Sequence, residues 1–380
     1  MNKYTDTYMQ GAYGSDGNQG SIYQKGMPIF DVDTPSIIVD LDVAEKNIKN
    51  MQDFANSQNV SMRPHSKTNK SPYWAKKQID QGAIGICCAK LGEAEEMAKG
   101  GISEILIPNQ IVGKSKIQRL VNVNKISKVM VAVENEDNVN ELSKAFEEKS
   151  LTLGVIIEVN VGMDRCGLDL DEIADFTKLI NEKKGLSFEG IMGYEGHTVN
   201  IDNYEERVNE TTKAMNKLIS ARDLIVENGI EVKIVSASGT GTYNITSKIE
   251  GITELQCGSY IFMDGNYLKI FDDFQPALSL MCTVVSRRKN NIVIDCGLKS
   301  VSMDQGLPEV VYPKGIKLIS LSEEHCKCII EEENDLKVGD KIFLRPMHSD
   351  TTINLHDDYF VHRDGILEES VPIAGRGKFK

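Results

Sequence analysis

The chain has 380 residues, of which 41% are hydrophobic and 26% charged, so it is long enough for one large folded domain and a smaller one. Its 56 acidic and 43 basic residues give a net charge of -13, and no long run of lysine and arginine interrupts this acidic background. Nucleic-acid binding is therefore not expected. No apolar stretch approaches the ~20 residues that a membrane span needs, so we expect no membrane association.

The N-terminus and the cysteines indicate a cytoplasmic protein. Residues 1–20 are rich in Asn, Gly, Tyr and Asp and lack the apolar core of a secretory signal. The cysteines show no C-x-x-C spacing and lie in apolar contexts, which is typical of reduced thiols in a protein core. They are Cys87, Cys88, Cys166, Cys257, Cys282, Cys296, Cys326 and Cys328. Cys326 and Cys328 beside His325 fit either a metal site or the alternation of a strand.

From about residue 36, short apolar runs alternate with longer amphipathic ones, a pattern typical of strands and helices in turn. A lead-in run at 36–42 precedes a helix at 43–57. Eight strands are expected at 61–65, 83–88, 104–108, 128–133, 152–160, 186–194, 232–237 and 253–257. Helices are expected at 72–81, 92–99, 114–123, 137–149, 171–183, 204–228 and 241–249. This order predicts an α/β fold whose main part, residues 36–275, is a (β/α)8 barrel of the TIM type.

After Phe274 the pattern changes to apolar runs joined by turn signals, with hardly a helix. Strands are expected at 278–285, 292–296, 316–321, 326–331 and 341–345. We therefore predict a separate β domain over residues 276–380, joined by part of residues 1–35.

Polar residues that follow the barrel strands are candidates for chemistry, because active sites of such barrels lie at the carboxyl ends of the strands. Lys67 follows the first strand, Arg165 the fifth, and the segment from Tyr194 to His197 the sixth. Most loop lysines are solvated surface charges, but a lysine held at a barrel mouth can form a Schiff base with an aldehyde. His197 fits either a proton-accepting base or a residue that packs against a cofactor.

Small and hydroxyl residues follow the last two barrel strands. These are Ser238, Gly239 and Thr240, then Gly258, Ser259 and Tyr260. Such loops are commonly plain turns, yet free backbone N–H groups at this place in a barrel also bind phosphate. A lysine facing a phosphate site suits pyridoxal 5′-phosphate, whose aldehyde needs an amine and whose phosphate needs such a cradle.

His348 and Asp350 follow the apolar run that ends at Arg345. If the segment is extended, residues two apart share a face, so the imidazole and the carboxylate would converge on one ion. A nitrogen and oxygen pair suits Mn²⁺ or Mg²⁺, although the same pattern is also common in polar turns.

Together these motifs resemble the D-threonine aldolase and D-serine dehydratase family, relatives of alanine racemase with a barrel followed by a β domain. The similarity runs from about Met27 to Arg363, and Arg63-Pro-His-Ser-Lys67-Thr looks like the family's cofactor-lysine motif. The resemblance implies that Lys67 forms the Schiff base, that Arg165 faces the pyridine nitrogen and that His348 and Asp350 hold a metal ion. It also implies phosphate binding by the loops that contain Ser238 and Gly258, with Tyr194 as a further cofactor contact.

Two positions bear on which branch of the family the chain is similar to. Asn69 stands where the family commonly has histidine, which leaves that residue's role open. Asp350 stands where dehydrating members tend to have cysteine, and a carboxylate favours the aldolase branch and a harder ion.

The resemblance implies retro-aldol cleavage of a D-3-hydroxy-amino acid to glycine and an aldehyde, in a homodimer. Dehydration of D-serine or 3-hydroxyaspartate uses the same parts and remains the alternative. A racemase is less favoured, because racemisation does not need a metal ion held by His348 and Asp350. A non-catalytic carrier of the cofactor would usually be a barrel alone, without the C-terminal domain.

Overall fold

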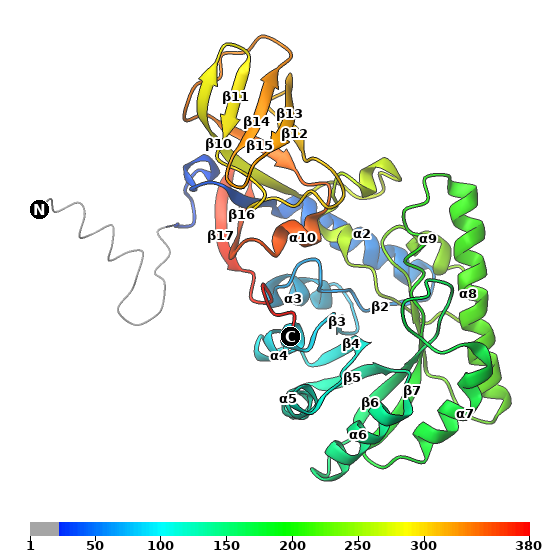
Figure 1. The fold of residues 1–380 in the computed structure, drawn as a ribbon. Coiled ribbons are helices and arrows are strands. Elements are labelled where there is room, and N and C mark those ends of the chain that lie inside the picture. Colours follow the sequence, from blue (N-terminus) through cyan, green and yellow to red (C-terminus); the bar gives the residue numbers. More distant parts are fainter. Residues whose placement is uncertain (1–22) are drawn as a thin grey trace, which may run out of the picture.

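The computed structural model describes residues 23–380 and consists of a barrel with a sheet domain packed against one end (Figure 1). The sequence-based expectation for residues 1–20 lies outside these described residues. Among residues 23–380, none of the helices is long and apolar enough to cross a membrane.

The first unit is a parallel sheet of eight strands in the order β2-β9-β8-β7-β6-β5-β4-β3. The two end strands are joined by a parallel bridge between His65 and Cys87, so the sheet closes on itself. Its strands are β2 (Ser61–Met62), β3 (Ile86–Cys87), β4 (Glu104–Gln110), β5 (Lys128–Val133), β6 (Leu153–Glu158), β7 (Leu186–Met192), β8 (Ile234–Ala237) and β9 (Glu254–Leu255). The predicted α/β barrel is confirmed.

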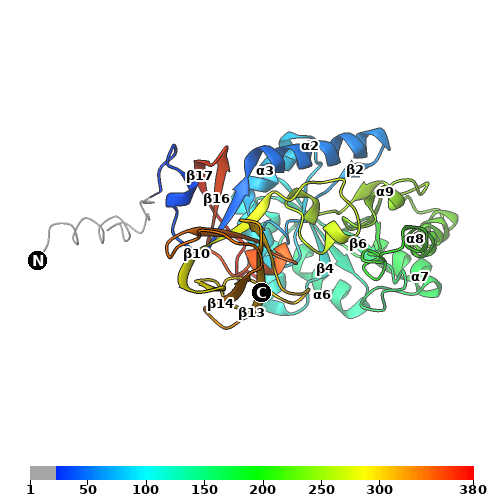
Figure 2. The same cartoon turned by 90° about the horizontal axis from the view of Figure 1, so that it is seen from above.

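Helices cover the outside of the barrel, as Figure 2 shows from above. They are α2 (Leu41–Ser57), α3 (Pro72–Asp80), α4 (Leu91–Lys99), α5 (Lys114–Asn124), α6 (Glu136–Glu147), α7 (Leu170–Asn181), α8 (Tyr204–Glu227) and α9 (Tyr243–Thr246). The Asp40 carboxylate caps α2 by accepting from the Val43 N–H. The helix expected over 241–249 is shorter, and it begins only after Gly241, where a side chain would lie 2.0 Å from the Val199 carbonyl.

The second unit is a mixed sheet with a short helix, α10 (Ser349–Ile353). Its strands are β1 (Ser36–Asp40), β10 (Leu278–Arg288), β11 (Asn291–Ile294), β12 (Glu309–Tyr312), β13 (Ile316–Leu321), β14 (Cys326–Ile330), β15 (Lys341–Arg345), β16 (Asp358–Arg363) and β17 (Ile366–Pro372). Strands β12, β16 and β17 were not expected from the sequence. The segment before β1 also joins this unit, because Pro28 bridges to Ile366 on β17.

Strand β1 was expected to lead into the barrel but lies in the mixed sheet, antiparallel to β10 and parallel to β16. Local periodicity does not reveal a partner strand more than two hundred residues away, and the apolar run suits either sheet. In β14, Cys326 and Cys328 are buried while His325 is exposed. Strand alternation therefore explains these cysteines, and the three residues do not converge on an ion.

Candidate active site

A cavity of about 340 Å³ lies at the carboxyl ends of the barrel strands. It brings together most of the residues that the sequence singled out for cofactor binding: Lys67, Arg165, Tyr194, Ser238, Gly239, Thr240, Gly258 and Ser259. Tyr260 is not in this lining, because its side chain is buried in the core and its hydroxyl accepts a hydrogen bond from Gln78 Nε2 at 2.9 Å.

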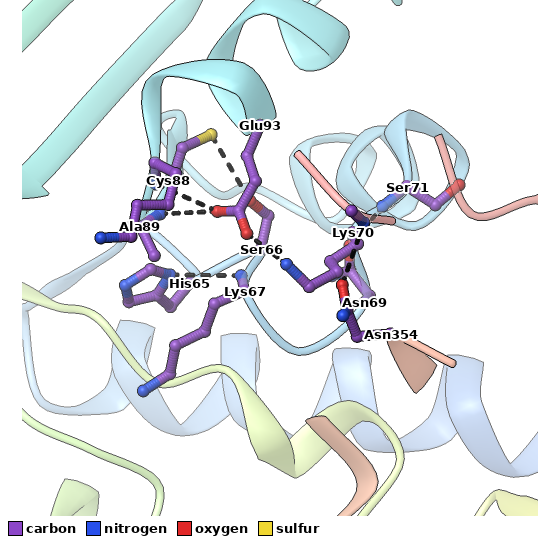
Figure 3. A network of polar contacts seen from close by, with 12 residues as sticks. His65, Ser66, Lys67, Asn69, Lys70, Ser71, Cys88, Ala89, Glu93 and Asn354 are labelled. Carbon is purple, nitrogen blue, oxygen red and sulfur yellow. Dashed lines mark hydrogen bonds and ion pairs between the residues drawn. The ribbon is translucent and has the colours of Figure 1, made fainter. Parts of the chain in front are cut away.

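The Lys67 amine is free to react. Within residues 23–380, Nζ makes no hydrogen bond or ion pair, and it lies 5.7 Å from the centroid of the Tyr194 ring. Figure 3 shows the side chain extending away from the polar network behind it. The Lys67 backbone is held by its N–H, which donates to His65 Nδ1 at 3.3 Å. A fixed backbone with a free amine is the arrangement that covalent cofactor attachment requires.

A buried ion pair supports the loop that carries Lys67. Lys70 Nζ pairs with Glu93 Oε1, and the other oxygen of this carboxylate accepts from the Ala89 N–H at 2.8 Å (Figure 3). Glu93 therefore ties the loop after β2 to the loop after β3. Removing one partner of such a pair leaves an uncompensated buried charge, which costs about 3–5 kcal/mol.

The loops after β8 and β9 present free backbone N–H groups, which together we term the amide cradle. The backbone N–H groups of Thr240, Gly241, Gly258 and Ser259 have no hydrogen-bond acceptor within the described residues. Gly258 is required here, because a Cβ atom would lie 2.6 Å from the His65 carbonyl oxygen. The cradle and the Lys67 loop are thus in direct contact, and free amides of this kind bind phosphate oxygens.

Glu195 holds the cradle in place, a role that the sequence did not reveal. Its carboxylate is fully buried and accepts from the Ser238 N–H and from the hydroxyls of Thr242 and Thr246. The distances are 3.1, 2.7 and 2.7 Å respectively. Ser238 has a φ of 84°, a strained value for a residue with a side chain, and the bond to Glu195 helps to hold it there.

The cavity lining carries positive charge and no carboxylate, although the chain has a net charge of -13. Its cations are Lys67, Lys90 and Arg165. The Arg165 guanidinium carbon lies 5.7 Å from the Tyr194 ring centroid, and its side chain pairs with no carboxylate in the described part of the chain. An amine, an amide cradle and an arginine around one anion-attracting cavity fit pyridoxal 5′-phosphate.

His65 and Tyr267 also line the cavity and were missed. Burial, reinforced by the charges of Lys67 and Lys70, lowers the pKa of His65 well below its ordinary value, so the imidazole is neutral. Alternation along an extended segment places His65 on the same side as Lys67, and this signal was available in the sequence. Tyr267 belongs to no recognisable motif, and burial raises the pKa of its hydroxyl.

Burial, with nearby charges that include Asp350, raises the pKa of Tyr267 in the cavity lining, so Asp350 lies near the cavity. His348 and Asp350 are not on one extended segment. Strand β15 ends at Arg345, His348 is the residue just before α10, and Asp350 lies in the first turn of that helix. The expected strand geometry was wrong, since acidic residues favour the first turn of a helix and the chain turns here. Asp350 Oδ1 is nevertheless buried without a hydrogen-bond partner, which is the state expected of a carboxylate that binds a cation.

Two further carboxylates complete this cluster. Asp304 Oδ2 lies 2.6 Å from His348 Nδ1, and Asp264 accepts from the Ser349 N–H at 3.3 Å. Burial, with the charge of Asp350, raises the pKa of Asp264 to about 6. Although burial opposes it, the hydrogen bond with His348 holds the pKa of Asp304 below its ordinary value. Oxygen and imidazole donors are the ligand types that a hard divalent ion prefers.

The cluster connects to the cavity through Tyr267, whose N–H donates to Asp264 at 3.0 Å. Asp264 and Asp304 lie in loops far from His348 in sequence, so no local pattern pointed to them. Another group, Glu134, Glu158 and Cys166, has ligand atoms within 4.8 Å of one another. Its carboxylates already accept from the Gly167 N–H and from Gln110, so we assign it no ion.

His197 is exposed and lies outside the cavity lining. Its Nε2 lies near Gly162, 3.5 Å from where a Cβ atom on that glycine would be. Both residues belong to loops that follow neighbouring strands, β6 and β7, at the same end of the barrel. A role as base therefore stays a prediction, because catalytic hydrogen bonds often form only when substrate is bound.

Comparison with known proteins identifies both units. Residues 39–265 match the family described as alanine racemase, N-terminal domain, and residues 277–362 match the putative serine dehydratase domain. A 3-hydroxy-D-aspartate aldolase of Paracoccus denitrificans is 36% identical, covering 93% of this chain and 94% of that protein. A D-threonine aldolase of an Arthrobacter species is 34% identical, covering 93% and 95%.

A more distant relative, a D-threo-3-hydroxyaspartate dehydratase of a Delftia species, is 25% identical over 73% of this chain and 75% of its own. Among solved structures, D-threonine aldolase from Filomicrobium marinum superposes with a TM-score of 0.91 at 33% identity. This match covers 94% of the present chain and 99% of that structure. Membership of this family supports pyridoxal 5′-phosphate as the cofactor. The chain therefore belongs to the family of lyases that joins an alanine racemase N-terminal domain to a serine dehydratase domain.

Proposed function

We propose that the chain cleaves a D-3-hydroxy-amino acid of the D-threonine type into glycine and an aldehyde, with pyridoxal 5′-phosphate and a divalent metal ion. One observation carries the proposal: the free amine of Lys67 and the amide cradle lie at one cavity, and Asp350, whose buried oxygen lacks a partner, lies near Tyr267 in the lining of that cavity. Exchange of the proton on Cα alone would not need this carboxylate and its neighbour His348. When bound, the cofactor accepts the electron pair that the broken bond leaves on Cα.

The barrel residues would hold the cofactor. Lys67 supplies the amine for its aldehyde, and the N–H groups of Thr240, Gly241, Gly258 and Ser259 donate to its phosphate. Arg165 donates a hydrogen bond to the pyridine nitrogen and keeps its own proton, because a guanidinium is always protonated in proteins. Tyr194, whose ring centroid lies 5.7 Å from both Lys67 Nζ and the Arg165 guanidinium carbon, would pack against the pyridine ring.

His348 and Asp350 would hold the metal ion, which we propose to be Mn²⁺ or Mg²⁺ from the nitrogen and oxygen donors. Bound there, the ion lowers the pKa of the substrate hydroxyl as a Lewis acid. His197 is the proposed acceptor of that hydroxyl proton. The shape of the pocket determines which substrate side chain is accepted beyond Cβ. One methylene group more or less changes the free energy of discrimination between two substrates by only about 1–3 kcal/mol.

The deciding experiment incubates purified, cofactor-loaded protein with D-threonine, D-serine and the stereoisomers of 3-hydroxyaspartate, with and without chelator, and identifies products by mass. Glycine with an aldehyde supports the proposal. Ammonia with pyruvate or oxaloacetate would instead establish the dehydratase, the activity named for the Delftia relative. Activity that resists the chelator would remove the metal ion from the mechanism, and no product from any substrate would overturn the lyase function.

We further propose that the protein is a cytoplasmic homodimer. All eight cysteines are free, which suits a reducing compartment. The dimer is what the family resemblance implies, with the β domain of one subunit near the barrel mouth of the other. Light scattering coupled to size-exclusion chromatography tests the dimer directly, since a monomeric mass for active protein contradicts it.

A further inference from the structure

We propose that Lys90 binds a carboxylate of the amino-acid substrate. The inference rests on the proposed function, since it assumes that an amino acid reacts at Lys67. Lys90 lies just after β3, is exposed at the rim and lines the cavity beside Asn109.

Charge is the first argument. Three cations line a cavity that has no carboxylate of its own, and two of them have proposed tasks, Lys67 at the aldehyde and Arg165 at the pyridine nitrogen. Lys90 is the cation left over. Its Nζ makes no ion pair or hydrogen bond with any residue in the range 23–380, so it can receive an anion without breaking a contact.

The order of the strands is the second argument. The phosphate loops follow β8 and β9, and β9 adjoins β2, which carries Lys67 at its end. Strand β3 adjoins β2 on the other side, through the bridge between His65 and Cys87. Around the barrel mouth, Lys90 therefore lies on the other side of Lys67 from the loops after β8 and β9, so it can contact a carboxylate of an amino acid that reacts at Lys67.

The support behind Lys90 is the third argument. Glu93 Oε2 accepts from the Ala89 N–H at 2.8 Å (Figure 3). It also accepts from the Lys90 N–H at 3.3 Å. On the opposite side, Asn109 Nδ2 donates to the Ala89 carbonyl at 2.9 Å. Because the backbone is fixed from both sides, less entropy is lost when Lys90 binds an anion. A lysine that is only solvated would not need this support.

The test compares Lys90→Gln with Lys90→Arg, which keeps the charge, and with Lys116→Gln as the matched control. Lys116 lies in a neighbouring hollow together with Lys90 but does not line the cavity. For each holoenzyme, kcat and KM are measured with D-threonine and with D-3-hydroxyaspartate, and the affinity for succinate, a dicarboxylate without an amine, is measured by calorimetry.

We expect Lys90→Gln to raise KM about 10- to 100-fold with a smaller change in kcat, the size of a lost charged hydrogen bond. Lys90→Arg should recover most of this loss, and Lys116→Gln should match the wild type. An equal rise for both substrates assigns Lys90 to the α-carboxylate, and a rise for D-3-hydroxyaspartate alone assigns it to the distal one. Unchanged KM for both substrates overturns the proposal.

Failure of the proposed function gives a different result. If the wild type cleaves neither substrate, succinate binding still decides, because it needs no turnover. Succinate affinity that falls in Lys90→Gln but not in Lys116→Gln keeps Lys90 as a carboxylate site. The proposal is overturned if the wild type does not bind succinate, or if all variants bind succinate with equal affinity.

Discussion

His348 Nδ1 lies 2.6 Å from Asp304 Oδ2, so Nε2 is the imidazole nitrogen left to face a metal ion. A carboxylate behind a ligating histidine fixes its tautomer and orientation, and its loss typically lowers metal affinity 10–100-fold. We therefore expect Asp304→Asn to bind Mn²⁺ about 10-fold or more weakly, measured by calorimetry or by electron paramagnetic resonance. Asp335→Asn, an exposed change in the same domain, is the control. Equal affinity in both variants would mean that Asp304 does not orient a ligand.

Replacing His197 tests the proposed base. Loss of a general base commonly slows turnover 10²–10⁴-fold, so His197→Ala should lower kcat by at least ~100-fold. It should keep the visible absorbance of the bound cofactor, because His197 lies outside the cavity lining. His325→Ala, an exposed change in the mixed sheet, serves as control. Normal turnover by His197→Ala would assign the proton to another group, such as hydroxide on the metal ion.

Glu195→Gln should weaken cofactor binding. An uncharged amide oxygen cannot hold the Ser238 N–H and two threonine hydroxyls as the carboxylate does, so the loop after β8 loses part of its fixed shape. We expect the dissociation constant of pyridoxal 5′-phosphate to rise about 10-fold, measured by titration of cofactor-free protein. The exposed Glu182→Gln at the end of α7 should leave it unchanged.

His65 should make stability depend on pH. Because its pKa is depressed in the folded state, the unfolded chain protonates this imidazole below its ordinary value of 6.5 while the folded protein does not. The stabilisation is thus present above pH 6.5 and is lost as the pH falls, by up to ~1.4 kcal/mol per pH unit. His65→Gln should flatten this slope in urea unfolding of cofactor-free protein, and an unchanged slope would contradict the buried neutral state.

The barrel was predictable from the sequence because each strand and helix has its own local period, and the rule for strand ends then located Lys67 and the phosphate loops. The pairing of β1 with β10 and β16 was not predictable, since it joins segments that are far apart in the chain. The same limit hid Asp264 and Asp304, which become neighbours of the metal motif only through folding.

Some errors were local. A strand was expected through His348 and Asp350. Pro346 has no backbone N–H to donate to a neighbouring strand, and the chain instead turns into α10. Tyr260 was grouped with the phosphate loop by sequence position, yet its ring packs into the core while Gly258 and Ser259 face the cavity. Adjacent residues in a tight loop point in different directions, and neither period 2 nor period 3.6 describes them.

Strand β1 lies between β10 and β16 in the mixed sheet. The domain that is translated last therefore contains a central strand that is translated before the barrel. On the ribosome, residues Ser36–Asp40 must wait for strands more than two hundred residues later before their backbone is paired. A protein cut between the barrel and residue 277 would leave this apolar strand exposed on one piece and a gap in the sheet of the other. In this chain the two units therefore share one strand, and we expect separation of the barrel from the sheet domain to destabilise both pieces.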